Sequence, residues 1–510
     1  MASIGNTGSR PTSSPSSSPQ VKAEPKLAEK PATQSQAKAQ PAENAVKAAV
    51  AERYQDGFDA APRKASASQP KIGEIGSHTH GPGDTHGAED SAAPSSTAAA
   101  AGSGPVVTTE ASGRTVVDLG SGSNNATVSQ ATDGGLKVTS DGKVVTLTAE
   151  QSRNAVIRGG AGNDNILVDA SVTSGISIEG GDGDDRLVGG EGDDRLMGGA
   201  GNDVIIGGNG KDWVWGDGGD DYLEGGAGDD TMDGGDGRDV MYGLDGNDSL
   251  SGGGSRDYID GGAGDDTASG GDGDDQVIGG RGNDTLNGDL GNDAVAGGLG
   301  KDVVQGGDGS DKLYVQDEDD AGDVAAGDTK QLVDMTDSDT LGSSISITGN
   351  ANFRARVESD LDAIRSMPIG HELLKGMDAS GKKTTIQETS AGNSAGGTKF
   401  SDGFMTADGK PGPGTDSQVN YNTTRTSLGN EDWMTRPPVV GFFHELVHAY
   451  DMVNGTLAPG QTDGTRNLEN AAVGLPIDHD GDASTPKITQ NRPAENHLRE
   501  ELNLPRRPRY

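Results

Sequence analysis

The chain has 510 residues, of which only 30% are hydrophobic and 3% aromatic, and its formal net charge is −39. With 84 glycines, much of this length is unable to form an ordinary hydrophobic core. The charge argues against nucleic acid and anionic membranes as partners. The absence of cysteine excludes disulfides and thiolate metal sites, and no apolar run is long enough to span a bilayer.

The amino-terminal region, residues 1–105, is rich in Ser, Pro, Ala, Gln and Lys, which predicts disorder. Its first twenty residues lack the apolar core of a cleavable secretory signal. A Ser-rich, uncharged start is instead typical of type III secretion signals. Short β-branched runs follow in residues 106–179, such as RTVVDL and VVTLT, and predict strands that begin and cap the next part of the chain.

Residues 180–314 consist of fifteen consecutive nine-residue repeats with the pattern G-G-x-G-x-D-x-U-x, where U is bulky and apolar. The only lapse in the fourth-position glycine is Ser255, and the eighth position is Leu, Ile, Val or Met except at Ala268. A further copy, GGAGNDNIL, lies upstream at 159–167 and out of register. Each repeat predicts a glycine turn and a very short strand whose U side chain points inward, so that two repeats form one coil of a parallel β-roll.

The sixth position of every repeat is aspartate, and these carboxylates are the candidate calcium ligands. They are Asp185, Asp194, Asp203, Asp212, Asp221, Asp230, Asp239, Asp248, Asp257, Asp266, Asp275, Asp284, Asp293, Asp302 and Asp311.

The charge of this block indicates that calcium is needed for folding. It holds 32 acidic and 8 basic residues, with about one inward apolar side chain in nine. Such a thin core does not offset the repulsion, whereas rows of Asp carboxylates and turn carbonyls supply the oxygen ligands that Ca²⁺ prefers. The sequence therefore predicts several structural calcium ions whose binding is coupled to folding.

The block resembles the RTX (repeats-in-toxin) β-roll of secreted bacterial proteins. The resemblance implies export of an unfolded chain and folding outside the cell at millimolar calcium. It does not identify an activity, because RTX arrays accompany enzymes, adhesins and pore-formers alike.

After a predicted cap and linker at 315–342, the composition of residues 343–510 becomes that of an ordinary globular domain with an α+β pattern. SISITG, TTIQE and SQVNYN predict strands, residues 352–367 predict an amphipathic helix, and residues 391–414 predict a Gly-rich loop. The next helix, bracketed by Gly441 and Gly455, carries the chemistry.

This helix contains the motif H-E-x-x-H at His444, Glu445 and His448. Residues four apart lie on one helical face, so both imidazoles are able to bind one zinc ion. Glu445 is placed to act as the general base that deprotonates the attacking water. A third ligand is required. Glu469, in a short helix with Thr465 as its expected cap, is the preferred choice, and Asp451, His479 and His497 are alternatives.

Residues 343–510 resemble the NleD-like family of type III effector zinc peptidases, through HELVHAYDMVNGT, LENAAVGLP and the terminal RPAENHLREELNLPRRPRY. The resemblance implies a zincin-like fold, zinc held by His444, His448 and Glu469, and Glu445 as the base. Some members cleave host MAP kinases, so a host kinase is one expected substrate. The R-x-x-Y ending is similar to a pair that stabilises the oxyanion in clostridial neurotoxin proteases, and this makes Arg507 and Tyr510 candidate catalytic residues.

The sequence thus predicts a multidomain, monomeric, secreted toxin-like effector, acting outside the cell or delivered into a host cell. Its disordered export region precedes an all-β parallel roll and a zinc endopeptidase that cleaves a host or competitor protein. Two alternatives remain: a non-enzymatic calcium-dependent surface or matrix protein, and a metal-dependent hydrolase of non-peptide substrates. Type I export is suggested by the repeats and type III export by the amino terminus.

Overall fold

The computed structural model describes residues 104–316, 320–322, 324–336, 340–406, 410–424, 426, 435–462, 465–477 and 492–508. The disorder predicted for the amino-terminal region therefore falls almost entirely outside the described residues. Within the described part, no helix combines the length and the apolar character that crossing a membrane requires.

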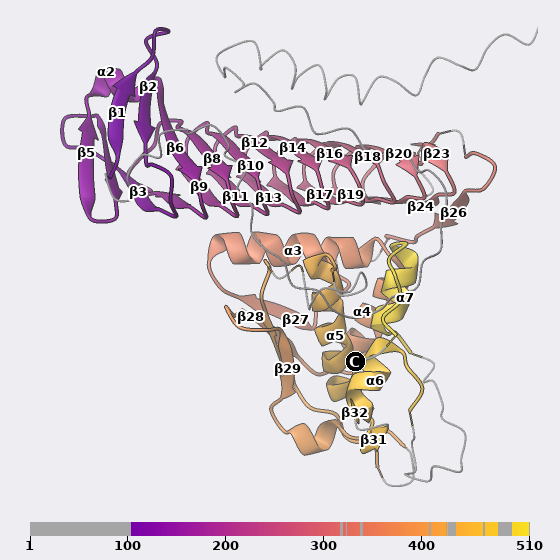
Figure 1. Ribbon diagram of the computed structural model, residues 1–510. Helices are drawn as coiled ribbons and strands as arrows, with labels where there is room; N and C mark the ends of the chain where they lie inside the picture. The colour runs from indigo at the N-terminus through magenta and orange to yellow at the C-terminus, as the bar shows by residue number, and fades with distance from the viewer. Residues whose placement is uncertain are drawn as a thin grey trace, which may run out of the picture. The chain divides into compact units, whose positions relative to one another are not determined.

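Two sheets of thirteen strands each, parallel except at the amino-terminal end, form the predicted β-roll (Figure 1). The strands before the repeats are β1 (Val106–Thr109), β2 (Thr115–Asp118), β3 (Asn125–Gln130), β4 (Leu136–Ser140), β5 (Lys143–Leu147), β6 (Ala155–Ala161) and β7 (Asn165–Val168), with helix α2 (Ala149–Ser152) after β5. The strands of the repeats are β8 (Ser177–Asp182), β9 (Arg186–Glu191), β10 (Arg195–Ala200), β11 (Val204–Asn209), β12 (Trp213–Gly218), β13 (Tyr222–Ala227), β14 (Thr231–Asp236), β15 (Val240–Asp245), β16 (Ser249–Gly254), β17 (Tyr258–Ala263), β18 (Thr267–Asp272), β19 (Gln276–Arg281), β20 (Thr285–Gly291), β21 (Ala294–Leu299), β22 (Val303–Gln305), β23 (Asp308–Gly309) and β24 (Lys312–Val315). Strands β25 (Asp320–Ala321) and β26 (Thr329–Leu332) extend the two sheets beyond the repeats.

The register of the sheets is the one expected for two repeats per coil. Each strand pairs in parallel with the strand two repeats away, so that Leu196 is opposite Ile178 on one side and Val214 on the other. The eighth-position side chains point inward and are fully buried, including the small Ala268. The predicted parallel β-roll is therefore confirmed, with one apolar side chain per repeat forming its core.

The upstream copy at 159–167 joins the same roll despite its different spacing. Strand β6 pairs with β8 and strand β7 with β9, in a register offset of 21 residues, as between Asn165 and Arg186. The extra residues lie between β7 and β8, outside the paired strands. The antiparallel strands β1, β4 and β5 close this end of the roll.

Residues 343–510 form an α+β region, as expected. A four-stranded sheet has the order β27 (Ile345–Thr348), β28 (Thr384–Glu388), β30 (Ser417–Tyr421), β29 (Ser394–Gly397), in which β29 is the antiparallel edge strand. The other elements are α3 (Ala351–Arg365), α4 (Pro368–Ala379), the 3₁₀ helix η1 (Phe400–Gly403), α5 (Pro438–Asn454), β31 (Gln461–Thr462), β32 (Thr465–Arg466), α6 (Asn467–Val473) and α7 (Glu495–Glu501).

Three local predictions were wrong. The segment 391–414 is not only a loop, because it contains β29 and η1, and β29 packs on α5. Helix α5 starts at Pro438, so Gly441 lies inside it, where an added Cβ would come within about 3 Å of Asn393 and Arg436 side chains. Thr465 does not cap α6, because it lies in β32 and the residue at the cap position is Arg466.

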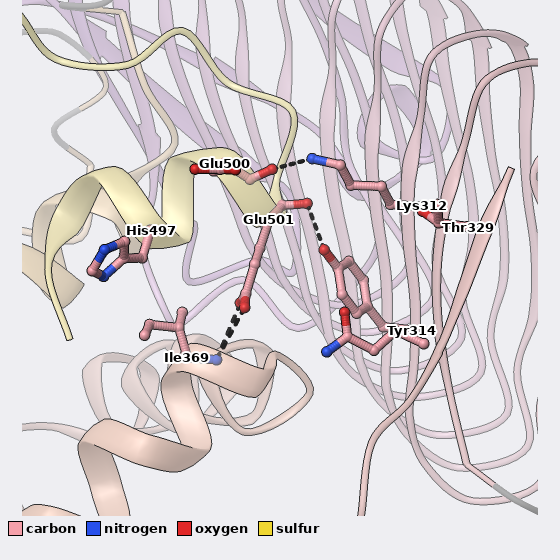
Figure 2. Close-up of a pocket in the computed structure, with 8 residues that line it drawn as sticks. Lys312, Tyr314, Thr329, Ile369, His497, Glu500 and Glu501 are labelled. Atoms are coloured by element: carbon pink, nitrogen blue, oxygen red, sulfur yellow. Dashed lines mark hydrogen bonds between the residues drawn. The ribbon is translucent and has the colours of Figure 1, made fainter. Parts of the chain in front are cut away.

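One face of the roll contacts the α+β region. Tyr222, Tyr242, Tyr258 and Tyr314 point outward from the sheet that contains β13, β15, β17 and β24, and share a hydrophobic cluster with α3 and α5 residues. Figure 2 shows the carboxyl end of α7 against the last repeat strands. There Tyr314 donates a hydrogen bond to the carbonyl of Glu501 at 3.1 Å, and Glu501 Oε1 accepts one from the Ile369 backbone at 3.1 Å.

Candidate metal centres

The sixth-position aspartates of the roll are buried and use one carboxylate oxygen in the fold itself. Oδ1 of Asp203 accepts the backbone N–H of Asp185 at 2.7 Å, and Oδ1 of Asp230 accepts that of Asp212 at 2.8 Å. The second oxygen, Oδ2, is different. In Asp185, Asp230 and Asp293, for example, it is buried and has no hydrogen-bond partner in the described part of the chain.

The first-position glycines leave space beside these oxygens. A Cβ added to Gly180 would lie 2.2 Å from Oδ2 of Asp185 and 2.6 Å from the carbonyl oxygen of Gly198, two repeats on. The same geometry recurs at other repeats, so two oxygens from adjacent coils border one small volume. An unpaired buried carboxylate oxygen is costly unless a cation occupies such a volume, and oxygen-lined sites suit Ca²⁺.

Burial also changes how these carboxylates ionise. It raises the pKa of Asp212 to about 6, of Asp194 to about 8 and of Asp257 to about 10. A carboxyl group with a pKa of about 8 or 10, as in Asp194 and Asp257, is protonated or bound to a cation near neutral pH. The residues therefore fit the predicted calcium ions.

The second candidate centre lies on α5. Pro438 occupies the first turn of this helix, and Gly455 ends it in a left-handed conformation with φ 69°. Apolar residues on the buried faces of the helix, such as Phe442 and Phe443, anchor it in the domain core. The rings of His444 and His448 are thereby fixed 4.8 Å apart between centroids, at an interplanar angle of 88°.

Glu469, in the first turn of α6, completes a three-residue cluster with these histidines. Its Oε2 lies 3.0 Å from Nε2 of His448 and 3.9 Å from Nε2 of His444, and one potential ligand atom from each of the three residues lies within 4.8 Å of the others. Ligands at about 2.1 Å from a tetrahedral zinc ion are about 3.4 Å apart, a value between the two measured distances. The residues present therefore fit a zinc ion.

Neighbouring carboxylates set the ionisation of the two imidazoles. Burial lowers the pKa of His444, but its contacts with Glu469 and Glu495 outweigh burial and the net pKa is raised. In His448, burial outweighs the hydrogen bond with Glu469, and the pKa is lowered. Glu445 also raises the pKa of both histidines electrostatically.

Two of the alternative third ligands, Asp451 and His497, are not part of this cluster. Asp451 is fully buried, ion-paired with Arg492, and accepts a hydrogen bond from Thr456 Oγ1 at 2.7 Å. His497 lines the pocket shown in Figure 2, next to the roll. His479 lies outside the described residues.

Arg507 contacts α7: its Nη1 lies 3.1 Å from Oε2 of Glu495, and its backbone N–H donates a hydrogen bond to Oδ1 of Asn496. Tyr510 lies outside the described residues, so its predicted role stays a prediction.

The sequence analysis missed Glu495 and Arg436. Glu495 is fully buried on α7, and its Oε2 lies 2.9 Å from Nδ1 of His444. Burial alone would raise the pKa of Glu495, but Arg436, His444 and Arg499 outweigh burial and hold the pKa well below its usual range. No spacing rule marks such a residue. The one available signal was an acidic residue among several arginines in the terminal segment that carries the family resemblance.

Comparisons with known proteins agree with this geometry. Residues 342–510 match the family model of Peptidase M91, described as an effector protein. The carboxyl-terminal third carries a Peptidase M91 effector domain. Overlapping segments between residues 152 and 328 match the RTX calcium-binding nonapeptide repeat, so the M91 domain follows an RTX array, as the resemblances implied. A search of the curated proteins found no match.

Proposed function

We propose that this protein is a secreted, zinc-dependent endopeptidase effector of the H-E-x-x-H type. The observation that carries the proposal is the cluster of His444, His448 and Glu469, whose potential ligand atoms lie within 4.8 Å of one another in a Peptidase M91 domain. A protein substrate follows from the peptidase family. The RTX repeats and the effector family are typical of secreted proteins.

Each residue of the cluster has a distinct task in this proposal. His444, His448 and Glu469 hold the metal, which when bound lowers the pKa of water and polarises a peptide carbonyl. Glu445 takes the proton of the attacking water as general base and delivers it to the leaving amine. The buried surroundings of the two imidazoles limit the water that competes for these contacts.

The RTX roll has a separate role in the proposal. Its carboxylates bind calcium outside the producing cell, where the ion is abundant, and binding drives folding of the roll. The oxygen pairs beside the first-position glycines support this assignment.

The test of the activity is cleavage profiling of a eukaryotic lysate with the full-length protein and its Glu445→Gln variant. Gln is nearly isosteric with Glu and leaves the three proposed ligands in place. We expect roughly 10²- to 10⁴-fold slower cleavage by the variant, with one zinc ion still bound per chain. The identity of the cleaved proteins tests whether a kinase is among them.

Equal cleavage by both proteins would contradict the proposed base. Zinc binding without any cleavage by the wild type would instead favour the non-enzymatic alternative.

A further inference from the structure

A buried cluster of one carboxylate and three guanidinium groups lies directly behind His444. Glu495 is fully buried at the start of α7. Its Oε1 lies 2.7 Å from Nε of Arg499 and 3.2 Å from Nη1 of Arg436, and its Oε2 lies 3.1 Å from Nη1 of Arg507 and 2.9 Å from Nδ1 of His444. Each oxygen thus accepts one hydrogen bond, from Arg499 or from Arg507, and has a second nitrogen of Arg436 or His444 within 3.2 Å, and these contacts offset the cost of burying the charge.

From this geometry we infer that Glu495 is the positioning residue of the candidate zinc centre. The inference rests on the proposed function. A neutral imidazole carries one proton, and a carboxylate at Nδ1 keeps that proton there. Nε2 of His444 then carries the lone pair of the ring, on the side of Glu469, where the metal would bind. Glu495 therefore selects the tautomer and the ring orientation that metal binding needs.

The two histidines differ in this respect. Nδ1 of His444 lies against Oε2 of Glu495, whereas among the described residues the carboxylate paired with His448 contacts its Nε2. The orientation of His448 is set on its other side, by the 3.0 Å contact between Nε2 and Glu469. Loss of Glu495 is thus expected to disturb the orientation of His444 and to leave His448 and Glu469 in place.

The arginines give the carboxylate a fixed place. Arg436 precedes α5, Arg499 lies on α7, and Arg507 lies in the segment after it. Three separate segments therefore contact one side chain, and a change in the rotamer of Glu495 would break at least one of its four contacts. In this arrangement Arg507 acts through Glu495, instead of contacting the oxyanion of the substrate.

The competing explanation is that the cluster only holds α7 onto α5. A matched control for it is Glu501, which lies on the same helix and bonds to the backbone of Ile369 without contacting an imidazole. We therefore compare Glu495→Gln with Glu501→Gln in the full-length protein. The readouts are zinc affinity, by competition with a fluorescent chelator, and thermal unfolding of the metal-free protein.

For Glu495→Gln we expect zinc to bind roughly 10- to 100-fold more weakly. Glu501→Gln should stay within about twofold of the wild type, since it leaves the imidazole contact intact. Wild-type zinc affinity in Glu495→Gln, or an equal loss in Glu501→Gln, would overturn the inference.

A second variant covers the case in which Glu495→Gln does not fold. Arg507→Gln removes one of the two nitrogens that contact Oε2 and leaves the carboxylate. We therefore expect a smaller loss of zinc affinity, and no loss would contradict the inference.

Failure of the proposed function is distinguishable from failure of this inference. If the wild type itself binds no zinc, the metal centre is wrong; if it binds zinc and cleaves protein while Glu495→Gln matches it, only the role of Glu495 is wrong.

Discussion

Asp451 and Glu469 are both buried acids, but they have different partners. Glu469 contacts Nε2 of His448, whereas Asp451 is paired with Arg492 and Thr456. The helical spacing from His444 allows Asp451 to share its face, which is why the sequence left both acids open as ligands. Because Asp451 is paired with the guanidinium of Arg492, we expect it to have a structural role.

Substitution of these two acids should therefore have different consequences. Loss of a residue that only orients a metal ligand weakens metal binding by roughly 10- to 100-fold. We expect Glu469→Gln to weaken zinc binding by more than this, because Glu469 is itself a proposed ligand. Asp451→Asn leaves the buried Arg492 without its counter-charge, and should lower the free energy of unfolding by roughly 3 kcal/mol or more. Chelator competition and denaturant unfolding of both variants check this. Strong zinc loss in Asp451→Asn at unchanged stability would assign the ligand to Asp451.

At the scale of an element, the effect of replacing a glycine depends on its position in the repeat. Gly216 and Gly218 lie on the same strand, β12, and neither has a positive φ. A Cβ at Gly216 would lie 2.3 Å from Oδ2 of Asp221 and 2.5 Å from the carbonyl of Gly234, while the nearest atom to a Cβ at Gly218 is 3.9 Å away. The first glycine borders the oxygen pair and the second does not.

Gly216→Ala is therefore expected to impair calcium-dependent folding and Gly218→Ala to be tolerated. Overpacking of about 1–3 kcal/mol would raise the calcium concentration at half-folding in the first variant, and because several ions bind as the roll folds we expect a rise of roughly twofold to fourfold. Circular dichroism during calcium titration measures the midpoint. Equal midpoints in the two variants would show that the volume beside Gly216 is not a cation site.

The raised pKa values of the roll predict an unusual pH dependence without calcium. The folded-state pKa of Asp194, about 8, exceeds the usual value near 4, so the folded roll binds more protons than the unfolded chain between these values. Its stability is present at acidic pH and is lost as the pH rises from about 4 to about 8. Circular dichroism in calcium-free buffer should show β-structure at pH 4.5 that is lost at pH 7.5 and returns with calcium. An equal β-signal at both pH values without calcium would be inconsistent with cation sites at these aspartates.

At the scale of the whole molecule, the side chain of Arg356 is one of the links between the roll and the α+β region. Arg356 of α3 is 2% exposed, pairs with Asp360 at 2.6 Å, and its guanidinium lies 3.2 Å from the ring centroid of Tyr242 on the roll. Asp360 also accepts a hydrogen bond from Tyr421 at 2.7 Å. Tyr421 in turn stacks on Phe442 of α5, with ring centroids 4.5 Å apart. The contacts thus run from the outward face of the roll to the helix that carries the histidines.

These contacts predict that calcium stabilises the M91 domain through the roll. At fixed zinc, removal of calcium should increase amide hydrogen exchange in α3, because Arg356 loses the ring of Tyr242. Exchange is measured by mass spectrometry in metal-depleted buffer with zinc added back, since calcium chelators also bind zinc.

A variant separates this coupling from folding of the roll. Tyr242→Ala leaves the inward-facing core unchanged, so its calcium midpoint should stay near the wild-type value. Helix α3 should lose part of its calcium dependence, because the ion pair of Arg281 with Asp362 still joins it to the roll. Exchange in α3 that is the same with and without calcium in the wild-type protein would contradict the coupling.

Much of this architecture is determined by local sequence, because its signals are short-range. The period of nine specifies the strands, their register and the inward side chains, and the motif of His444, Glu445 and His448 needs only the geometry of one helix. Even the outward tyrosines carry a signal, since Tyr222 and Tyr258 are 36 residues apart and Tyr242 and Tyr314 are 72, multiples of the 18-residue coil. Residues at such spacings lie on the same face of one sheet.

Only the tertiary structure decided which side chains from distant segments meet. The proximity of Glu469 to the histidines, the pairing of Asp451 with Arg492, and the convergence of Arg436, Arg499 and Arg507 on Glu495 depend on how α5, α6 and α7 pack. The contact of Arg356 with Tyr242 depends on it as well. These contacts have no fixed sequence separation, because packing brings them together through buried area and charge compensation, which act between surfaces and leave no period in the chain.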